Sequence, residues 1–522
     1  MIRKKHIFKL MVATTVCMIA GSSCKKSFLD VPPQGQLTEE QALVDPAAAE
    51  KLVGGVYNTL YFGSFGNNTV GFLWVMMNDV ASDDADKGSF PGDFGAAGEI
   101  DNFTFTPNNF IFNNVWAGHF QAIIRANKAI DILNKSTIDE TTRKRLTGEA
   151  RFLRGYYYFN LVRAFGGVPK VTRIPDPSEG NSDEFQTRAS ATEIYNVVKE
   201  DLQYAVDNLP MKGDAGFVVG RISKGAAQGM LAKVYLYLKD YQKAFDLSKA
   251  VIESGRYSLA PDYATIHREV GVNNSESIFE VQTGPHRGVD NCDAVSPLFS
   301  NGQGPRSRGS WVNVVDGKRY DGDLGFGLNS PSADLAGVYE AGDTRRAATI
   351  IFVQPTVGGG PNPGTVLWDG FRIPTQDSVE NPRYSYKAYH SPFKETASCN
   401  GYLDKDFKPK NIRLLRYAEV LLIYAEAAAN VPGQAGEATA KLNMVRARAN
   451  LPATTGTVAN IWKERRVELA MEQDRFFDLV RTGQAATVLA SKGFVPGKHE
   501  VFPIPQPQRD LSGGRLSQNP NY

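Results

Sequence analysis

The stretch from Lys224 to Gly255 decides the fold and reads KGAAQGMLAKVYLYLKDYQKAFDLSKAVIESG. Leu231, Ala232 and Tyr235 fall on one helical face, and Ala244 follows nine residues later. This spacing is typical of a tetratricopeptide repeat, in which small alanines let two helices approach closely. A generic α-hairpin is the alternative for this stretch taken alone. One hairpin cannot bury its own apolar face, so the sequence predicts several stacked hairpins.

Other stretches extend this helical pattern on both sides. Arg416 to Leu451 predicts a second hairpin of the same kind, and Thr192 is an N-cap candidate followed by a helix. Helical spacing of apolar residues predicts further helices at 109–134, 148–165 and 192–209. The predicted fold class is therefore mainly α, a superhelix of tetratricopeptide-like hairpins.

The N-terminus has the layout of an export signal. Arg3-Lys4-Lys5 is basic, Ile7 to Ala20 is a short apolar run, and Gly21-Ser22-Ser23 precedes Cys24. The apolar run is too short to span a bilayer, so residues 1–23 are predicted to be a cleaved signal peptide. The cysteine after small residues indicates lipidation at Cys24, although Gly21 stands where an aliphatic residue is usual. A plain secretory signal is the alternative.

Composition argues against nucleic acid and against a cysteine-based metal site. Four of the 58 basic residues lie in the first 23 positions, which leaves 54 against 56 acidic residues in the rest. A nearly neutral chain offers no electrostatic footprint for a polyanion, so we expect no nucleic-acid partner. Beyond Cys17 and Cys24 only Cys292 and Cys399 remain, and one disulfide or two free thiols are equally compatible with them.

The chain divides into five predicted regions by composition. A Gly- and Pro-rich region with interspersed aromatics interrupts the helices, and short strands such as 348–353 are expected in it. Residues 57–105 form a similar aromatic loop segment. The regions are 1–23 (signal peptide), 24–45 (lipidated N-terminus and tether), 46–260 (helical scaffold with ligand-side loops at 57–105), 261–405 (loop-rich ligand-binding α+β region) and 406–522 (C-terminal helical repeats that pack with 46–260 as one unit).

Sequence blocks along the chain resemble the SusD/RagB family of Bacteroidetes outer-membrane lipoproteins. The blocks are Phe28-Leu29-Asp30-Val31-Pro32, Asn78-Asp79, Ser82-Asp83-Asp84, Gly148-Glu149-Ala150-Arg151-Phe152-Leu153-Arg154, Phe165-Gly166-Gly167-Val168-Pro169, Arg416-Tyr417-Ala418-Glu419, Glu464-Arg465-Arg466-Val467-Glu468-Leu469, Arg475-Phe476-Phe477-Asp478-Leu479-Val480-Arg481, Phe502-Pro503-Ile504-Pro505 and Asn519-Pro520-Asn521-Tyr522. They cover nearly the whole chain after Cys24 in the expected order.

The resemblance implies a lipid-anchored protein on the outside of the outer membrane that binds an oligosaccharide. It also implies a partner, a SusC-like TonB-dependent β-barrel transporter that receives the ligand. A peptide-binding member of the same family and a repeat scaffold that binds only protein are the alternatives. Arg475 and Asp478 are three residues apart on one helical face, which predicts a local ion pair.

A sugar site needs aromatic platforms beside polar side chains that bond hydroxyl groups. Two loop segments, 74–90 and 306–320, combine such residues, and Trp368 follows them. The predicted ligand-binding residues are Trp311, Tyr320, Asn313, Arg306, Trp368, Phe90, Asp83 and Asp84. Each aromatic side chain has a core position as its alternative.

Catalysis is not expected from this sequence. It contains no GxSxG, P-loop or HExxH motif, and Asp83-Asp84 are adjacent residues that usually point apart. A hydrolase is therefore the least favoured interpretation of the sequence. No cofactor is predicted, but Asp316, Asp321 and Asp323 are weak candidates for a structural calcium, with a solvated acidic turn as the alternative.

Replacing Trp311 tests the sugar-site prediction. We expect Trp311→Ala to weaken oligosaccharide binding, because a stacking platform is removed, while the melting temperature stays nearly unchanged. Isothermal titration calorimetry and differential scanning calorimetry measure the two quantities. A large fall in melting temperature would instead identify Trp311 as a core residue.

Overall fold

The computed structural model describes residues 38–522, apart from 64, 284–298, 309–311, 316–317, 322–323, 356–363, 393 and 396–409. Cys24, Cys292 and Cys399, with the predictions attached to them, lie outside the described residues. Among the residues described, no helix is both long and apolar enough to span a membrane.

The described chain is mainly helical, with short strands between the helices. The helices are α2 (Glu39–Val44), α3 (Pro46–Tyr57), α4 (Phe72–Val75), α5 (Gly95–Asp101), α6 (Phe110–Lys135), α7 (Glu140–Phe165), α8 (Asp183–Gln186), α9 (Ala191–Asn208), α10 (Lys224–Tyr237), α11 (Tyr241–Glu253), α12 (Phe299–Gln303), α13 (Ala333–Val338), α14 (Arg345–Thr349), α15 (Tyr417–Asn430), α16 (Ala435–Arg448), α17 (Val458–Leu469), α18 (Arg475–Arg481), α19 (Ala485–Val488) and α20 (Gln506–Leu511). The strands are β1 (Ala85–Gly88), β2 (Ser277–Val281), β3 (Val312–Val315), β4 (Lys318–Asp321), β5 (Leu328–Pro331), β6 (Ile350–Phe352), β7 (Thr365–Val366), β8 (Arg372–Ile373), β9 (Arg383–Ser385) and β10 (Ile412–Arg416).

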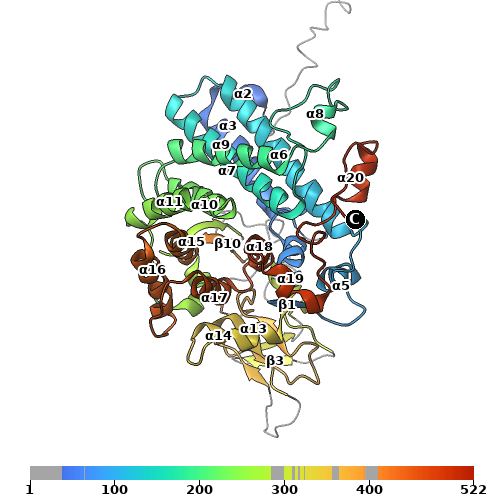
Figure 1. The fold of residues 1–522 in the computed structure, drawn as a ribbon, viewed down its shortest axis with the longest axis vertical. Helices are drawn as coiled ribbons and strands as arrows, with labels where there is room; N and C mark the ends of the chain where they lie inside the picture. Colours follow the sequence, from blue (N-terminus) through green and yellow to red (C-terminus); the bar gives the residue numbers. More distant parts are fainter. Residues whose placement is uncertain are drawn as a thin grey trace, which may run out of the picture.

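The predicted tetratricopeptide-like hairpins are confirmed. Helix α10 pairs with α11, and α15 pairs with α16. Helix α11 packs against α15, where the rings of Phe245 and Tyr424 stack with centroids 4.6 Å apart. Figure 1 shows these four helices on the left of the molecule, below the layer of α2, α3, α6, α7 and α9. Two hairpins far apart in sequence thus form one continuous helical stack.

Helix α7 lies in the centre of the upper layer and contacts α6 and α9. A Cβ atom added at Gly148 would lie 3.2 Å from the side chain of Leu209, and one added at Gly155 would lie 3.3 Å from Cβ of Asp201. The absence of side chains at these glycines lets α9 approach α7 closely.

The structure corrects three helix boundaries. Helix α7 begins at Glu140, capped by Asp139, well before the predicted start at 148. Helix α9 is capped by Ser190 in a capping box with Glu193, because the Ser190 hydroxyl reaches the backbone N–H of Glu193; Thr192 lies inside the helix. Helix α2 occupies residues 39–44 of the predicted tether, since Thr38 and Gln41 form another capping box.

The loop-rich region is folded around a small core of its own. Five two-stranded sheets occur in the described chain, and β6–β9 and β7–β8 belong to this region. The core residues are Leu324, Ile351, Val353, Leu367, Phe371, Ile373, Val379, Tyr384 and Tyr389. A strand predicted at 348–353 is present but shorter, as β6 over Ile350–Phe352, because helix α14 extends to Thr349. Figure 1 shows α13, α14 and β3 at the lower end, away from the upper helical layer.

A network of buried ion pairs lies in the centre of the molecule, and one of its two main carboxylates is Glu468 at the end of α17. Glu468 is fully buried, and its carboxylate accepts hydrogen bonds from Arg345 at 2.9 Å, Arg416 at 2.7 Å and Arg448 at 2.5 Å. These arginines come from α14, β10 and α16. A single carboxylate therefore holds the loop-rich region and the C-terminal hairpin against α17.

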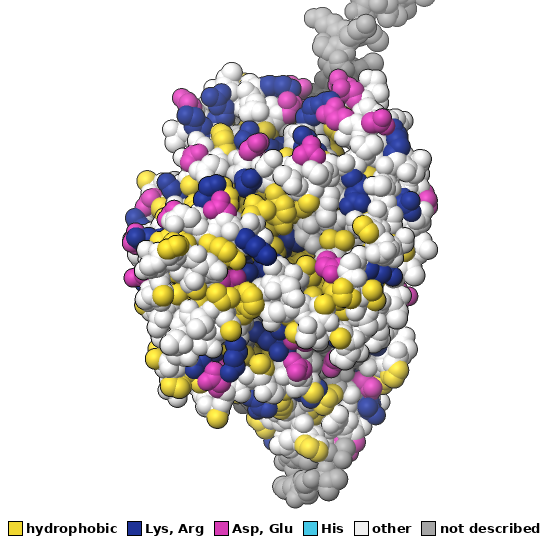
Figure 2. All heavy atoms as spheres, viewed as in Figure 1, with side chains coloured by type: hydrophobic (Ala, Val, Ile, Leu, Met, Phe, Trp, Pro, Cys, Tyr) yellow, Lys and Arg dark blue, Asp and Glu magenta, His cyan; other side chains and the backbone are white. Residues whose placement is uncertain are grey.

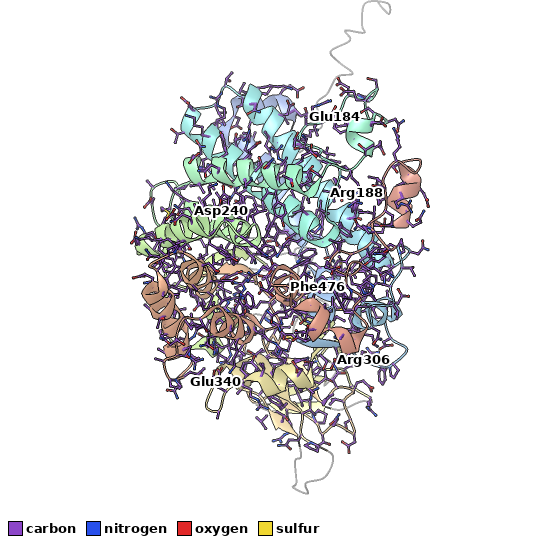
Figure 3. All side chains as sticks on the ribbon, viewed as in Figure 1. Glu184, Arg188, Asp240, Arg306, Glu340 and Phe476 are labelled. Atoms are coloured by element: carbon purple, nitrogen blue, oxygen red, sulfur yellow. The ribbon has the colours of Figure 1, made fainter. Side chains whose placement is uncertain are left out.

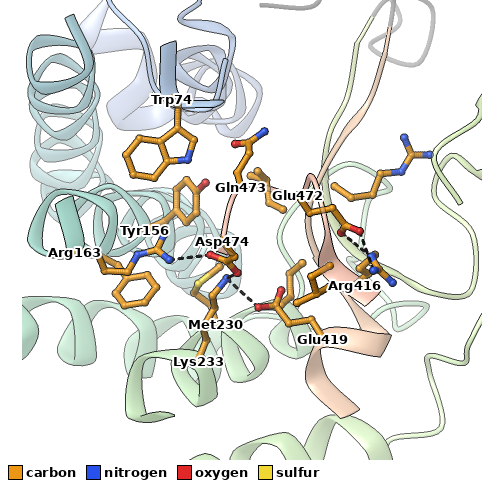
Figure 4. A pocket seen from close by; sticks show the side chains of 15 residues that line it. Trp74, Tyr156, Arg163, Met230, Lys233, Arg416, Glu419, Glu472, Gln473 and Asp474 are labelled. Atoms are coloured by element: carbon orange, nitrogen blue, oxygen red, sulfur yellow. Dashed lines mark hydrogen bonds and ion pairs between the residues drawn. The ribbon is translucent and has the colours of Figure 1, made fainter. Parts of the chain in front are cut away.

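Asp474, just before α18, is the second centre of this network. It pairs with Arg163 at 3.0 Å, with Arg465 at 3.3 Å and with Lys233. Figure 4 shows Arg163 and Lys233 converging on Asp474 from two different helices. Asp474 thereby connects the C-terminal segment to α7 and α10 of the N-terminal scaffold.

The predicted local pair between Arg475 and Asp478 is wrong. Arg475 forms two hydrogen bonds to Asp83, at 2.8 and 2.9 Å, and Asp478 accepts from Arg465 at 2.7 Å and from Arg481 at 2.6 Å. Sequence spacing favours local pairs, but buried carboxylates from distant segments compete for the same arginines once the chain folds.

Glu468 offers a direct test of this network. Burial opposes its ionisation, but Arg448, Arg416 and Arg345 outweigh burial and hold its pKa well below the ordinary range. The unfolded chain therefore takes up the proton first, so stability is complete above about pH 5 and falls as acid is added below about pH 4. We expect Glu468→Gln to lower the free energy of unfolding at pH 7 by about 3 kcal/mol and to flatten this acid dependence.

Chemical denaturation between pH 3 and 8 measures both effects. The control is Glu200→Gln, at an exposed position inside α9, which should leave both nearly unchanged. An acid dependence equally steep in Glu468→Gln and in the wild type would contradict the assignment.

Candidate functional site

The two predicted ligand segments meet through a pair of strands. Strand β1 pairs antiparallel with β5, with Ala85 opposite Pro331 and Gly88 opposite Leu328. Strand β1 lies in the 57–105 segment, and β5 begins at Leu328, a short loop after the 306–320 segment. Pairing therefore places loops from two distant parts of the chain side by side, on the side of the molecule where Figure 3 labels Arg306.

Arg306 and Phe90 are the predicted site residues that lie in contact. The guanidinium carbon of Arg306 lies 5.5 Å from the centre of the Phe90 ring, and its Nη2 lies 3.9 Å from Asp93. Lys87 donates hydrogen bonds to the backbone oxygens of Phe90 and Asp93, at 2.8 and 2.9 Å. The loop that carries the Phe90 ring is thus held in place before any ligand arrives.

A cluster of phenyl rings lies next to this loop. Phe65 and Phe110 are 47% and 40% exposed, and Phe94 and Phe326 are half-buried. The ring centroid of Phe94 lies 5.6 Å from that of Phe65 and 5.7 Å from that of Phe110, and Phe326 lies 6.5 Å from Phe65. Phe72 is fully buried beneath them. We call Phe65, Phe94, Phe110 and Phe326 the ring cluster.

Phe94 reaches the ring cluster through a strained backbone. Its φ of 49° and ψ of 56° lie in the left-handed region, which a bulky residue rarely adopts. Such a conformation costs about 1–2 kcal/mol and persists where the surrounding structure requires a side chain in one position. Packing of the Phe94 ring between Phe65 and Phe110 holds the residue in this conformation.

Asp83 and Asp84 were predicted to contact a ligand, and the structure contradicts this. Asp84 has no exposed surface and pairs with Arg466 at 2.8 Å; Asp83 pairs with Arg475 at 2.8 Å and with Arg466 at 2.9 Å. Burial raises the pKa of Asp84, whereas for Asp83 the hydrogen bond and charge of Arg475 outweigh burial and lower the pKa. Both carboxylates are structural because the arginines of the C-terminal helices enclose them.

Of the remaining predicted residues, only Trp368 has a side chain that the structure describes. Trp368 is half-buried on the small core, with Arg268 4.4 Å above its ring. Asn313 and Tyr320 lie opposite each other on the β3–β4 hairpin. Trp311, Asp316 and Asp323 lie outside the described residues, and only the backbone of Asp321 is described, at the end of β4.

The ring cluster was not among the residues predicted from the sequence to bind a ligand. Phe65 and Phe94 occur in the aromatic segment 57–105, but only the tertiary contacts show that they join Phe110 and Phe326. The available signal was the density of aromatics among glycines, which cannot separate exposed rings from core rings such as Phe72.

One small cavity is part of the ion-pair network. It has a volume of about 30 Å³, enough for one water molecule, and Trp74, Arg163, Lys233, Arg416 and Asp474 are among its lining residues. Figure 4 shows its charged side chains bonded to one another across the cavity. A sugar cannot enter it, so this cavity serves the fold.

The outer surface carries charges of both signs. Figure 2 shows Lys and Arg interspersed with Asp and Glu over the face in view, with hydrophobic patches between them. No single-sign field dominates this face, in keeping with the formal net charge of +2 for the whole chain.

Comparison with known proteins defines the class first. Residues 28–236 match a family described as starch-binding and associating with the outer membrane, and residues 313–522 match the SusD family. With the helical-repeat fold, these matches define an outer-membrane-associated binding protein. The chain belongs to the SusD/RagB family.

Individual relatives resemble the chain over most of its length. SusD-like protein P2 of Formosa agariphila is 26% identical, over 95% of this chain and 96% of its own. The starch-binding protein SusD of Bacteroides thetaiotaomicron is 25% identical, over 77% of this chain and 76% of its own. A solved structure of a laminarin-binding SusD-like protein is 29% identical with a TM-score of 0.73, covering 91% of this chain and 99% of that chain.

Asp83→Asn tests the structural role of the aspartate pair. Removing one charge leaves Arg475 and Arg466 short of a buried partner, so we expect the free energy of unfolding to fall by about 3 kcal/mol. Ligand affinity of the folded protein should stay within twofold of the wild type. Thermal unfolding and calorimetric titration check these outcomes, and a loss of affinity at full stability would return Asp83 to the ligand site.

Proposed function

We propose that this protein captures a neutral oligosaccharide at the cell surface on its ring cluster, with Phe90 and Arg306 beside it. The observation that carries the proposal is the contiguous set of partly exposed phenyl rings next to a fixed polar loop. Soluble proteins seldom leave such rings together in water without a ligand or partner.

The chemistry of the surface suits a sugar. Pyranose rings present flat C–H faces that pack on phenyl rings, while their hydroxyl groups need hydrogen-bonding neighbours. Arg306 supplies donors at the edge of the rings, and Asp93 supplies a carboxylate 3.9 Å from it. Since these two charges compensate each other, the surface favours a neutral glycan over an anionic one.

Two relatives indicate which glycans to test first. One is described as binding laminarin and another as binding starch, and both ligands are neutral glucose polymers. The chain shares 29% and 25% identity with them. We infer a glucan-type ligand for this chain, bound without chemical conversion, as in a binding protein.

The anchor and the partner complete the proposal. Acylation of Cys24 would hold the protein on the outer membrane by its lipid chains, each buried methylene contributing about 0.8 kcal/mol. The captured glycan would pass to a SusC-like TonB-dependent β-barrel, the partner that membership of the SusD/RagB family implies. A peptide-binding role is the main competing outcome of the experiment that follows.

Calorimetric titration against a panel of glucan oligosaccharides and peptides tests this function. We expect saturable binding of laminarin- or starch-derived oligosaccharides, and an affinity loss of at least about tenfold, or 1.4 kcal/mol, in Phe65→Ala and Phe94→Ala. The control is Met444→Ala, which shortens a side chain that is 41% exposed on α16, a helix that Figure 1 shows on the opposite side of the molecule from α5. Peptide binding with no glucan binding would refute the proposal, as would full affinity in both phenylalanine variants.

A further inference from the structure

A separate pocket lies where the end of α3 meets the loop before α10 and strand β2. It has a volume of about 250 Å³, and the 3-10 turn η2 (Asn58–Tyr61) forms one wall. The lining residues that matter here are Gly54, Tyr57, Tyr61, Val219, Arg221 and Gln282. Neither the predicted site residues nor the ring cluster belongs to it.

The walls of this pocket are fixed by buried hydrogen bonds. The Thr59 hydroxyl lies 2.5 Å from the Tyr157 hydroxyl, and the Thr59 carbonyl accepts from Thr69 at 2.6 Å. The Tyr57 hydroxyl accepts from the backbone N–H of Ile222 at 2.9 Å, which ties the end of α3 to the loop before α10. A pocket with walls held in this way needs little reorganisation to bind a ligand.

The pocket has no excess of positive charge, because the buried Glu280 is among its lining residues and Arg221 is paired. Arg221 pairs with Glu149 at 2.9 Å and with Glu50 at 3.2 Å, and its guanidinium lies 4.9 Å from the centre of the Tyr57 ring. Two carboxylates leave no excess positive charge for a uronate or sulfate group, but the guanidinium carries five N–H donors, of which these pairs use two. The pocket therefore suits a neutral ligand with hydroxyl groups.

The size and lining of the pocket match one sugar ring. Its volume is below the roughly 300–1,000 Å³ of sites that enclose a drug-sized ligand. Val219, 65% exposed, and the ring of Tyr61 supply apolar surface, and Gln282 supplies an amide. Strand β2 is paired with β10 and buried along its length, so it offers no open edge to a peptide.

The chain itself connects this pocket to the ring cluster. Tyr61 lines the pocket, and Phe65 belongs to the ring cluster four residues later. At 3.8 Å between consecutive Cα atoms, the two residues are at most about 15 Å apart. An oligosaccharide of several units can span that distance.

We propose that this pocket holds one neutral sugar unit of the same oligosaccharide that lies on the ring cluster. The proposal rests on the proposed function and makes the pocket a subsite that selects for chain length. Two linked sites raise the affinity for a ligand long enough to reach both, whereas a shorter ligand gains nothing from the second site.

Gly54 provides the test, because it lines the pocket and a Cβ atom there would meet no atom within 4 Å. Gly54→Leu should fill the pocket without disturbing the fold. Gly55→Leu is the matched control: Gly55 is the next residue of α3, is equally unobstructed, and does not line the pocket. The probes are laminarin- and starch-derived oligosaccharides of two and six units, titrated calorimetrically, with melting temperatures recorded for each variant.

We expect Gly54→Leu to bind the hexasaccharide at least fivefold more weakly and the disaccharide with unchanged affinity, at an unaltered or higher melting temperature. Gly55→Leu should match the wild type for both ligands.

Wild-type hexasaccharide affinity in Gly54→Leu would overturn the subsite, even if Phe94→Ala abolishes binding and so supports the ring cluster. Loss in Gly54→Leu with full binding in Phe94→Ala would refute the ring cluster and keep the pocket. The sugar assignment of the pocket would be overturned if the wild type bound no glucan. It would also be overturned if the wild type bound a peptide and only Gly54→Leu abolished that binding.

Discussion

The fold depends on two buried carboxylates, Glu468 at the end of α17 and Asp474 just before α18, that pair with cationic side chains from the rest of the chain. Glu468 binds three arginines and Asp474 binds a lysine and two arginines, all largely buried. Removing such charges from water is costly, and only complete pairing offsets that cost. Hydrophobic packing alone tolerates small slips between layers, whereas this network is satisfied only when the N-terminal scaffold, the loop-rich region and the C-terminal hairpin are all in place.

A frame fixed in this way can carry irregular loops without losing their geometry. The β1–β5 pair is attached to it through Asp83 and Asp84, whose partners Arg466 and Arg475 lie on α17 and α18. The loop with Phe90 and the strained Phe94 continues directly from β1. The rings that are proposed to meet a glycan are therefore positioned by ion pairs far along the chain, which explains how residues predicted for the site serve its support instead.

Regular elements were the part of the fold most open to prediction. The hairpins at 224–255 and 416–451 follow from short-range spacing of small and large apolar residues, and both are present. Errors arose where spacing was ambiguous, as with the cap of α9, since Ser190 and Thr192 are both good capping residues. The pairing of Arg475 was mispredicted because sequence neighbours are visible in a sequence and partners such as Asp83, nearly four hundred residues away, are not.

The sequence by itself determined the helical-repeat class, the lack of a polyanion footprint in the composition and the membership of the family that the residue blocks resemble, and it predicts an export signal. Those properties depend on local periodicity, local composition and the order of motifs, all of which can be read along one dimension. Only the tertiary structure decided which aromatic rings stay exposed and which charged side chains form buried ion pairs. Exposure and long-range pairing depend on what other segments cover, and the same Phe or Asp serves either purpose until those segments are placed.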